Sequence, residues 1–386
     1  MKKILIIGTA YPYRGGLAAY NERLATEFMY NGEEVTIHTF KLQYPGFLFP
    51  GKSQFVSWEA PKHLSIKRTI NSINPFNWIW LGRKIKRMKP DLVIFKYWIP
   101  FMAPCFGTIA RIAKKNKKTR IITIVDNMIP HEKRPGDRLL NRYFIKPIDA
   151  YIAMSESVLE DIKNIDPEKP RALSPHPLFD NFGDIVSKKD ALNKLGLPDQ
   201  HKYILFFGFI RDYKGLDLLL KAMVEKEVKD LPIKVLIAGE FYTKPDPYYD
   251  LIKQLKIEDR VILKTKFIAD SEVKNYFCAS DLVVQPYKSA TQSGVTQIAY
   301  HFNKPMIVTD VGGLSEIVPD GKTGYVVQQD PAAIAKAIHT FFSENRSKDF
   351  IENIKSEKKK YSWSRMVEAI EIIYKSIIIQ HNDNKK

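Results

Sequence analysis

The sequence predicts an α/β protein with two doubly wound parallel-sheet domains in tandem. Its 386 residues suit two cores of roughly 150–200 residues each. Short apolar runs alternate with helix-length segments, which is typical of a parallel sheet covered on both faces. This alternation starts a second time after a stretch with four prolines, residues 167–177, which is the best linker candidate.

The first series opens with an apolar strand and a loop that contains Gly15 and Gly16. A helix follows in which Leu17, Tyr20, Leu24 and Phe28 share one face, and Gly32 stands where that helix should end. The strands of this series are expected at residues 3–8, 34–40, 92–96, 121–125 and 150–154.

The second series has the same character, and a helix around residues 331–342 and a last amphipathic helix at 363–379 follow it. Its strands are expected at residues 203–208, 234–239, 261–266, 282–285 and 306–309. We therefore expect domains at residues 1–178 and 179–362, followed by a C-terminal helix and tail at 363–386. Ligands of such sheets bind outside the carboxyl ends of the strands, so a cleft between the two domains is the expected active site.

Composition excludes several classes of protein. Cys105 and Cys278 lie far apart without a histidine at ligand spacing, so neither a disulfide framework nor a zinc module is expected. The opening apolar run ends at Gly8, too early for a signal peptide. The uncharged stretch at residues 97–110 contains two prolines and is shorter than the roughly 18 apolar residues of a spanning helix. We expect a cytoplasmic protein.

The positive charge is concentrated in the first half. The net charge is +17, of which residues 1–180 hold +13, and residues 83–120 contain twelve basic residues and one acid, Asp91. Such an excess indicates an anionic partner, either nucleic acid or membrane, although solubility alone would also explain it. No nucleic-acid motif accompanies the charge, so we expect no nucleic acid as partner.

The basic segment at residues 78–88 is the candidate membrane contact. Trp78, Leu81, Ile85 and Met88 share one helical face there, and four cations flank them: Arg83, Lys84, Lys86 and Arg87. Tryptophan with flanking cations suits a lipid headgroup boundary. The alternative is a surface helix that buries this apolar face in its own domain.

The start of the chain does not match a dinucleotide site. That site needs G-x-G-x-x-G after the first strand and an acid at the end of the second. Here six residues separate Gly8 from the glycine pair, and the second strand runs into Phe40-Lys41, so NAD and FAD are not expected. The glycine pair at a helix N-terminus can still offer amides to an anion, or form a plain strand-to-helix turn.

Three polar turns of the second domain follow strand ends. Arg211 and Lys214 follow the 203–208 strand, where two cations could stabilise a leaving diphosphate, unless carboxylates pair with them. Ser293 is the expected N-cap of the next helix, which would leave the amides of Gly294, Val295 and Thr296 open to phosphate oxygens. A third turn covers residues 310–316. Together these turns predict an anion site.

These motifs resemble the family-4 glycosyltransferases of the GT-B fold. The resemblance rests on Gly-Phe-Ile-Arg211-Asp-Tyr-Lys214-Gly, on Gln292-Ser293-Gly294-Val295, on the segment from Asp310 to Gly324, and on Arg14-Gly15-Gly16 and Asp126–Glu132 in the first half. It covers nearly the whole chain. It implies two Rossmann-like domains that face each other across a cleft, and a C-terminal helix that crosses back to the first domain.

The resemblance also assigns roles to residues. Arg211 and Lys214 would bind the donor diphosphate, Gly16 would let the first loop approach the donor, and Glu316 would lie near the ribose or phosphate. Phe267 and Ile268 would belong to the base-binding loop, with Ser293, Gly294, Val295 and Thr296 also on the donor. Asp126, His131 and Thr291 are the candidate catalytic residues.

Two positions depart from the family pattern. Relatives carry two glutamates whose counterparts fall near Thr291 and Ile298, and neither is acidic here. The usual His-Asn or His-Asp after the 121–125 strand is Asp126-Asn127, with the nearest histidine at His131.

The resemblance implies a hexosyltransferase that moves a sugar from a nucleotide-diphosphate donor with retention of configuration. No D-x-D triplet occurs, which fits chemistry without a metal, and no cofactor is expected beyond the sugar nucleotide. We expect a lipid-linked or polysaccharide acceptor, a role in polysaccharide biosynthesis, and peripheral contact with the inner face of the cell membrane. The alternatives are a GT-B nucleotide-sugar epimerase and a non-catalytic nucleotide-sugar-binding subunit.

Overall fold

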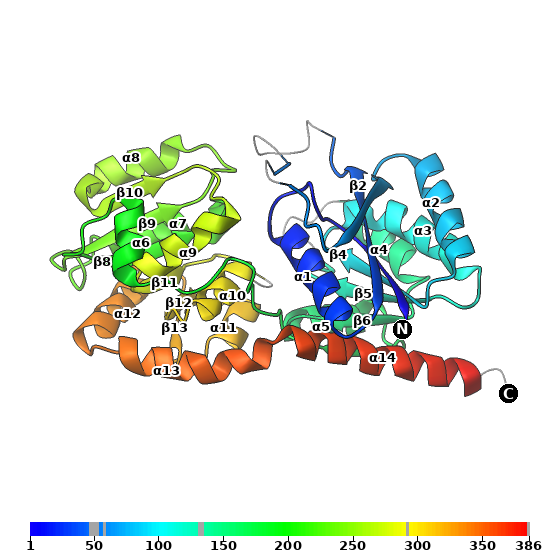
Figure 1. Ribbon diagram of the computed structural model, residues 1–386. Coiled ribbons are helices and arrows are strands. Elements are labelled where there is room, and N and C mark those ends of the chain that lie inside the picture. Colours follow the sequence, from blue (N-terminus) through cyan, green and yellow to red (C-terminus); the bar gives the residue numbers. More distant parts are fainter. Residues whose placement is uncertain (46–53, 57–58, 130–134, 291–292, 384–386) are drawn as a thin grey trace. The chain divides into compact units, whose positions relative to one another are not determined.

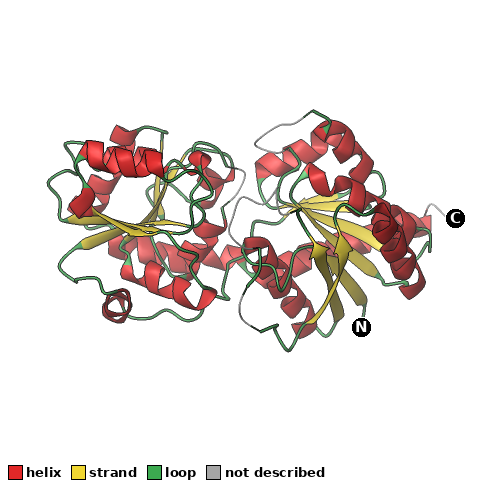
Figure 2. Ribbon diagram, turned by 90° about the horizontal axis from the view of Figure 1, so that it is seen from above, coloured by secondary structure: helices red, strands yellow, loops and turns green. Residues whose placement is uncertain are grey.

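The structure is a computed structural model that describes residues 1–383 except 46–53, 57–58, 130–134 and 291–292. The chain divides into two compact units, each with its own sheet. Unit 1 comprises residues 1–177 and 362–386, and unit 2 comprises residues 178–361. Within each unit, helices cover both faces of the sheet (Figures 1 and 2).

Unit 1 contains a seven-stranded parallel sheet in the order β3-β2-β1-β4-β5-β6-β7. Most of its strands are continuous apolar runs, which a sheet with two covered faces requires. The strands are β1 (Lys3–Ile7), β2 (Glu34–Leu42), β3 (Ser65–Asn71), β4 (Leu92–Tyr97), β5 (Arg120–Val125), β6 (Ala150–Ala153) and β7 (Arg171–Leu173).

Two groups of helices cover this sheet. One core joins alternate strand residues such as Phe95 to apolar side chains of four helices, and aromatic rings including Phe106 and Phe144 pack at its centre. These helices are α2 (Pro75–Met88), α3 (Ala103–Lys114), α4 (Asp137–Ile145) and α5 (Glu156–Ile165). Helices α1 (Gly16–Tyr30) and α14 (Trp363–Asp383) pack against each other, and α14 also contacts β5, β6 and β7.

Unit 2 contains a six-stranded parallel sheet in the order β10-β9-β8-β11-β12-β13. The strands are β8 (Lys202–Phe207), β9 (Ile233–Ala238), β10 (Val261–Lys264), β11 (Leu282–Gln285), β12 (Met306–Thr309) and β13 (Gly324–Val327). The helices are α6 (Lys188–Leu195), α7 (Leu216–Ala222), α8 (Asp246–Leu255), α9 (Asp270–Ala279), α10 (Gly294–His301), α11 (Gly313–Ile317), α12 (Pro331–Ser343) and α13 (Ser347–Glu357). In both sheets the order reverses beside the first strand of the series, as in doubly wound folds.

The two-domain α/β prediction is confirmed, and all ten expected strands are present to within two residues at either end. Three further strands were not expected: β3, β7 and β13. Each lies at the edge of its sheet and pairs with one neighbour only. Strand β7 lies inside the stretch expected to be a linker, so the interpretation of all of residues 167–177 as linker was wrong.

Candidate functional site

Glycines shape the carboxyl end of β8 in unit 2. Gly208 follows the strand with φ +98°, and a Cβ there would lie 2.9 Å from Nζ of Lys214. Gly215 begins α7 with φ +67°, and a Cβ would lie 1.9 Å from the carbonyl oxygen of Pro286. Only glycine allows this left-handed conformation and this close approach. The chain between them therefore turns tightly, and it presents Arg211 and Lys214 at the strand end.

Lys214 is buried, with 8% of its surface exposed. Within the described residues no carboxylate forms an ion pair with it, and its ammonium lies 5.3 Å from the ring centroid of Tyr287. Burial lowers the pKa of Lys214; the charge of Arg211 lowers it further, while Tyr213 opposes the shift. A buried lysine without an acidic partner is costly, so this position is typical of an anion site.

Arg211 supplies the second cation of this turn. Its guanidinium lies 5.2 Å from the ring centroid of Tyr242, and the described part of the chain contains no ion pair to it. The ring of Tyr242 is itself stacked on Phe209 at 4.2 Å. Aromatic neighbours thus position both cations without neutralising them.

The first turn of α10 lies beside Lys214. A Cβ at Gly208 would be 3.6 Å from Cγ2 of Val295, so Gly208, Lys214 and Val295 meet at one point. Ser293 has the extended backbone of an N-cap, but its hydroxyl donates to Oε1 of Gln285 at 2.7 Å and does not cap the helix. The expectation that Thr296 offers a free amide was wrong, because that N–H donates to the carbonyl of Ser293 at 3.2 Å.

The other predicted donor-side residues lie on separate elements of the two units. Phe267 and Ile268 are half-buried between β10 and α9, and Glu316 is exposed on the short helix α11. Gly294 begins α10, and a Cβ there would lie 2.8 Å from the ring of Phe179. Gly16 is the exposed first residue of α1 in unit 1. His131 and Thr291 lie outside the described residues.

Of the two positions where the resemblance puts a glutamate, Thr291 lies outside the described residues and Ile298, in α10, is apolar. Ile298 is buried, and its neighbour Gln297 is completely buried. Among the described residues, neither amide atom of Gln297 has a hydrogen-bond partner. The sequence analysis did not identify Gln297. The signal that could have identified it is an amide side chain in the mainly apolar helix α10.

Asp126 forms a buried ion pair that the sequence analysis missed. Its Oδ1 accepts from Nζ of Lys96 at 2.7 Å, at the carboxyl ends of β5 and β4. Lys96 is 1% exposed, and its ammonium lies 3.5 Å above the ring of Tyr20. Burial lowers the pKa of Lys96 and raises that of Asp126, while their mutual attraction acts in the opposite sense. Lys96 stands in an otherwise apolar strand, which is the signal that could have identified it.

His176 lies against the same cluster. Its ring centroid is 5.2 Å from that of Tyr20, and its Nδ1 donates to the carbonyl of Pro177 at 2.7 Å. Burial, and then the charge of Lys96, lower the pKa of His176 to about 3. The imidazole is therefore neutral near pH 7. A neutral histidine beside the Lys96–Asp126 pair gives unit 1 a polar cluster at its strand ends.

The described residues contain no cluster of metal ligands and no helix that could span a membrane. No three histidine, cysteine or acidic side chains lie close enough together to hold a metal ion. No helix there combines the length and apolar character needed to cross a bilayer.

The chain was compared with known proteins. Residues 14–175 match the family model described as Glycosyltransferase Family 4, and residues 187–357 match Glycosyl transferases group 1. The D-inositol 3-phosphate glycosyltransferase of Corynebacterium urealyticum is 26% identical over 261 residues, which are 64% of this chain and 61% of that protein. The alignment thus spans about three-fifths of this curated relative's length.

Two solved structures show the same fold. Sucrose-phosphate synthase from Thermosynechococcus elongatus has a TM-score of 0.75 and 17% identity, and the match covers 98% of this chain and 100% of that one. HepE of Anabaena, solved in complex with UDP and glucose, has a TM-score of 0.70 and 15% identity, covering 99% and 100%. Together the two family models place the chain in family 4 of the glycosyltransferases, and the structural matches show that it has the GT-B fold.

Proposed function

We propose that this protein transfers a sugar from a nucleotide-diphosphate donor to an acceptor, with Arg211 and Lys214 as the diphosphate ligands. The observation that carries the proposal is Lys214, which is buried without an acidic partner in the described chain, at a strand end and beside the first turn of α10. A bound diphosphate would supply the missing negative charge.

The proposed chemistry needs positioning and charge stabilisation. Negative charge develops on the diphosphate as the sugar–phosphate bond breaks, and fixed cations stabilise it without reorganisation. The acceptor would attack from the face that the diphosphate leaves, which retains the configuration. Arg211 and Lys214 would take the role that a metal ion has in other transferases, so we propose that no metal is required.

The candidate catalytic residues in unit 1 would contact the acceptor or the transferred sugar. Asp126 keeps 19% of its side chain exposed, so its carboxylate can still reach a ligand while Lys96 holds it. His131 and Thr291 remain predictions.

The acceptor is proposed to be lipid-linked or a growing polysaccharide at an anionic membrane surface. Most of the predicted apolar face of residues 78–88 packs into unit 1: Trp78 contacts the core and Leu81 and Ile85 are buried. Met88, at the end of that face, is 40% exposed. A different stripe of α2 is exposed: Phe76 at 84% and Trp80 at 49%, with cations at the following turns. It would place the protein peripherally on the inner face of the membrane.

A panel of nucleotide sugars tests the proposed function. The panel starts with UDP-glucose, because HepE was solved with UDP and glucose. Acceptors include inositol 3-phosphate, which the name of the curated relative suggests, and lipid-linked sugars. We expect transfer, or slow hydrolysis without acceptor. An isomerised sugar would indicate the epimerase, and tight binding without turnover would indicate the non-catalytic subunit.

A further inference from the structure

A basic groove crosses unit 1 at the amino ends of β5, β6 and β7. Two contiguous hollows of about 690 and 500 Å³ form it, and both are lined by Lys114, Lys117 and Lys146. The charged side chains along the groove are seven cations, Arg111, Lys114, Lys115, Lys117, Arg120, Lys146 and Lys169, and two acids, Asp149 and Glu168. Among the described candidate residues of unit 1, Asp126 and Gly16 follow the carboxyl ends of strands, at the opposite end of the sheet.

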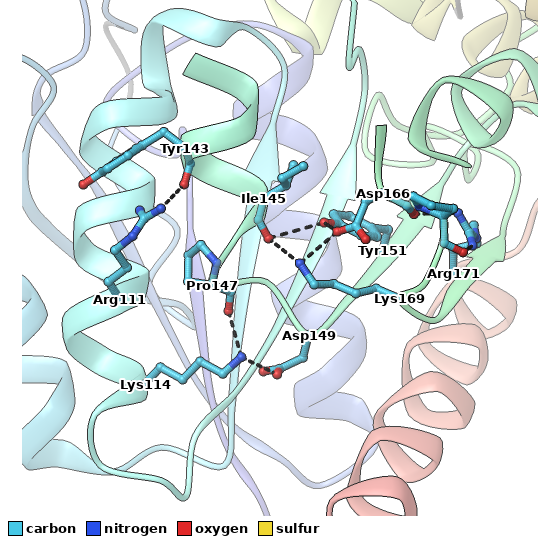
Figure 3. A network of polar contacts seen from close by, with 11 residues as sticks. Arg111, Lys114, Tyr143, Ile145, Pro147, Asp149, Tyr151, Asp166, Lys169 and Arg171 are labelled. Carbon is cyan, nitrogen blue, oxygen red and sulfur yellow. Dashed lines mark hydrogen bonds and ion pairs between the residues drawn. The ribbon is translucent and has the colours of Figure 1, made fainter. Parts of the chain in front are cut away.

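A polar network holds part of the groove in place (Figure 3). Nζ of Lys114 donates to Oδ1 of Asp149 at 2.6 Å and to the carbonyl of Pro147 at 3.1 Å. The second oxygen of Asp149 accepts from the amide of Ile121 at 2.8 Å. Asp149 is thus fully engaged in the structure. It fixes Lys114 and leaves little negative charge to balance the other cations.

The network continues on the other side of the α4–β6 connection. Nζ of Lys169 donates to the carbonyl of Ile145 and pairs with Asp166, each at 2.8 Å. Arg111 donates to the carbonyls of Gly107 and Tyr143, and its guanidinium lies 3.7 Å from the ring centroid of Tyr143. Figure 3 shows Arg111, Lys114 and Lys169 reaching this connection from both sides.

Four cations of the groove have no acidic partner among the described residues: Lys115, Lys117, Arg120 and Lys146. Nε of Arg120 is buried without a hydrogen bond, while its terminal nitrogen donates to the carbonyl of Lys117 at 3.5 Å. Apart from Asp149, the acid that lines the groove in the described chain is Glu168. It is exposed and forms no ion pair with these four cations. Like charges gathered in a concave surface repel each other, so an anion in the groove would stabilise it.

We propose that this groove binds a compact ligand that carries two or more phosphate groups. Ammonium and guanidinium donors from several elements converge there, which suits phosphate oxygens. No aromatic ring of the described residues lines either hollow, so none of them would stack on a nucleobase in the groove. The chemistry is shared by free polyphosphates and by phosphorylated lipid headgroups.

Inorganic pyrophosphate is the probe that tests the groove. It is titrated calorimetrically into the full chain and into the double variant Lys117→Gly/Lys146→Gln. Lys117 has φ +61°, so glycine removes its charge without straining the turn. With both proteins also carrying Arg211→Ala, so that the proposed donor site does not contribute, we expect binding to weaken about tenfold or more, because hydrogen bonds to charged groups are lost. Raising the ionic strength should weaken the binding of wild type.

Two control variants show where on the protein pyrophosphate binds. Lys118→Gln removes the same charge from the same turn, but Lys118 pairs with Asp91 at 2.9 Å and does not line the groove. It should change the affinity less than twofold. Arg211→Ala lies in unit 2 and should leave the groove's binding intact. Binding that is lost in Arg211→Ala but kept in the groove variant that retains Arg211 would assign pyrophosphate to unit 2 and overturn the proposal.

Vesicles distinguish the two sources of phosphate. If pyrophosphate does not bind, vesicles that contain a phosphorylated phosphoinositide are sedimented with each variant. Every protein in this assay also carries glutamine at Arg83, Lys84 and Arg87, so that helix α2 contributes no binding of its own. Loss of sedimentation in the groove variant, with Lys118→Gln unaffected, would identify a lipid headgroup as the ligand. Binding of neither probe, or equal behaviour of the groove variant and Lys118→Gln, would overturn the proposal. Tryptophan fluorescence checks that unit 1 of each variant is folded.

Discussion

Lys96 and Lys214 are both buried lysines at strand ends, but their surroundings differ. Lys96 has Asp126 at 2.7 Å, so its charge is compensated within unit 1. Lys214 has aromatic neighbours and no acidic partner in the described chain. The sequence indicated Lys214 through its position after a predicted strand, whereas the partner of Lys96 follows another strand and no local pattern reveals it. The burial of the Lys214 charge therefore requires a ligand as its explanation, whereas the burial of Lys96 is explained by Asp126.

Substitution of Lys214 separates a functional role from a structural one. Lys214→Met keeps the apolar contacts and removes a buried charge without a partner, so the free energy of unfolding should not fall. Loss of a charge-stabilising contact should slow sugar transfer at least about 100-fold, or about 3 kcal/mol, and Arg211→Ala should act similarly. Steady-state kinetics measures this. Lys221→Ala, exposed on α7, is the control. Near-normal rates in both site variants would refute the donor assignment.

Two buried histidines predict a pH-dependent stability of unit 1. Burial lowers the pKa of His38 to about 4 and that of His176 to about 3, from an ordinary 6.5. Between these values the unfolded chain binds protons that the folded chain does not. The free energy of unfolding therefore has its full value above about pH 6.5. It falls on acidification, and at pH 4 it is lower by about 3 kcal/mol per histidine.

Tryptophan fluorescence can follow this change, because all five tryptophans belong to unit 1. Urea unfolding is measured between pH 4 and pH 7. His38→Asn should flatten the pH dependence, whereas His63→Asn should not, since His63 is exposed. A free energy of unfolding that is independent of pH over this range would contradict the prediction.

At the scale of elements, all central strands were predicted, whereas three of the four edge strands (β3, β7 and β13) were not. The central strands are continuous apolar runs because both faces are covered. Strand β3 has the sequence SIKRTIN, with exposed polar residues, and β7 has three residues between prolines. Pairing with one neighbour decides their conformation, and local sequence does not reveal that neighbour. The same limit applies to the groove, whose lysines come from separate elements.

Helix α14 is predicted to be essential to unit 1. Trp363 at its start is 3% exposed, packs on Tyr20 with ring centroids 5.0 Å apart, and lies 5.3 Å from the guanidinium of Arg23. Trp363→Ala should lower the free energy of unfolding by about 3–5 kcal/mol. The remaining tryptophans report the transition. Ile372 lies on the same helix and is 62% exposed, so Ile372→Ala should change the free energy of unfolding by less than about 1 kcal/mol. Equal effects would exclude this role.

At the scale of the whole molecule, the proposed chemistry assigns the donor charges to side chains of unit 2. Catalysis that relies on Arg211 and Lys214 should continue when divalent ions are removed. We expect the rate of transfer to be unchanged after dialysis against EDTA. Complete loss of activity, with recovery on adding Mn²⁺ or Mg²⁺, would show that a metal takes part.

The uneven charge of the chain gives the last prediction. Residues 1–180 carry +13 and the rest carry +4. Helix α2 adds a surface hollow of about 410 Å³ where exposed Phe76 and Trp80 lie with three cations, and the ammonium of Lys84 is 5.2 Å from the ring of Trp80. Each basic residue near an anionic membrane contributes about 1 kcal/mol, so this stripe should produce reversible, salt-sensitive binding.

Vesicle sedimentation tests whether this stripe binds membranes. Wild type should sediment with anionic vesicles, remain in solution with neutral ones, and be released by high salt. Replacing Arg83, Lys84 and Arg87 with glutamine should abolish sedimentation, whereas the same change at the basic residues Lys62, Arg138 and Lys163, none of which lies on α2, should not. Hydrolysis of the donor should be unaffected, because the donor ligands belong to unit 2. If wild type binds both kinds of vesicle equally, or neither, the charge serves solubility and a soluble acceptor becomes the better assignment.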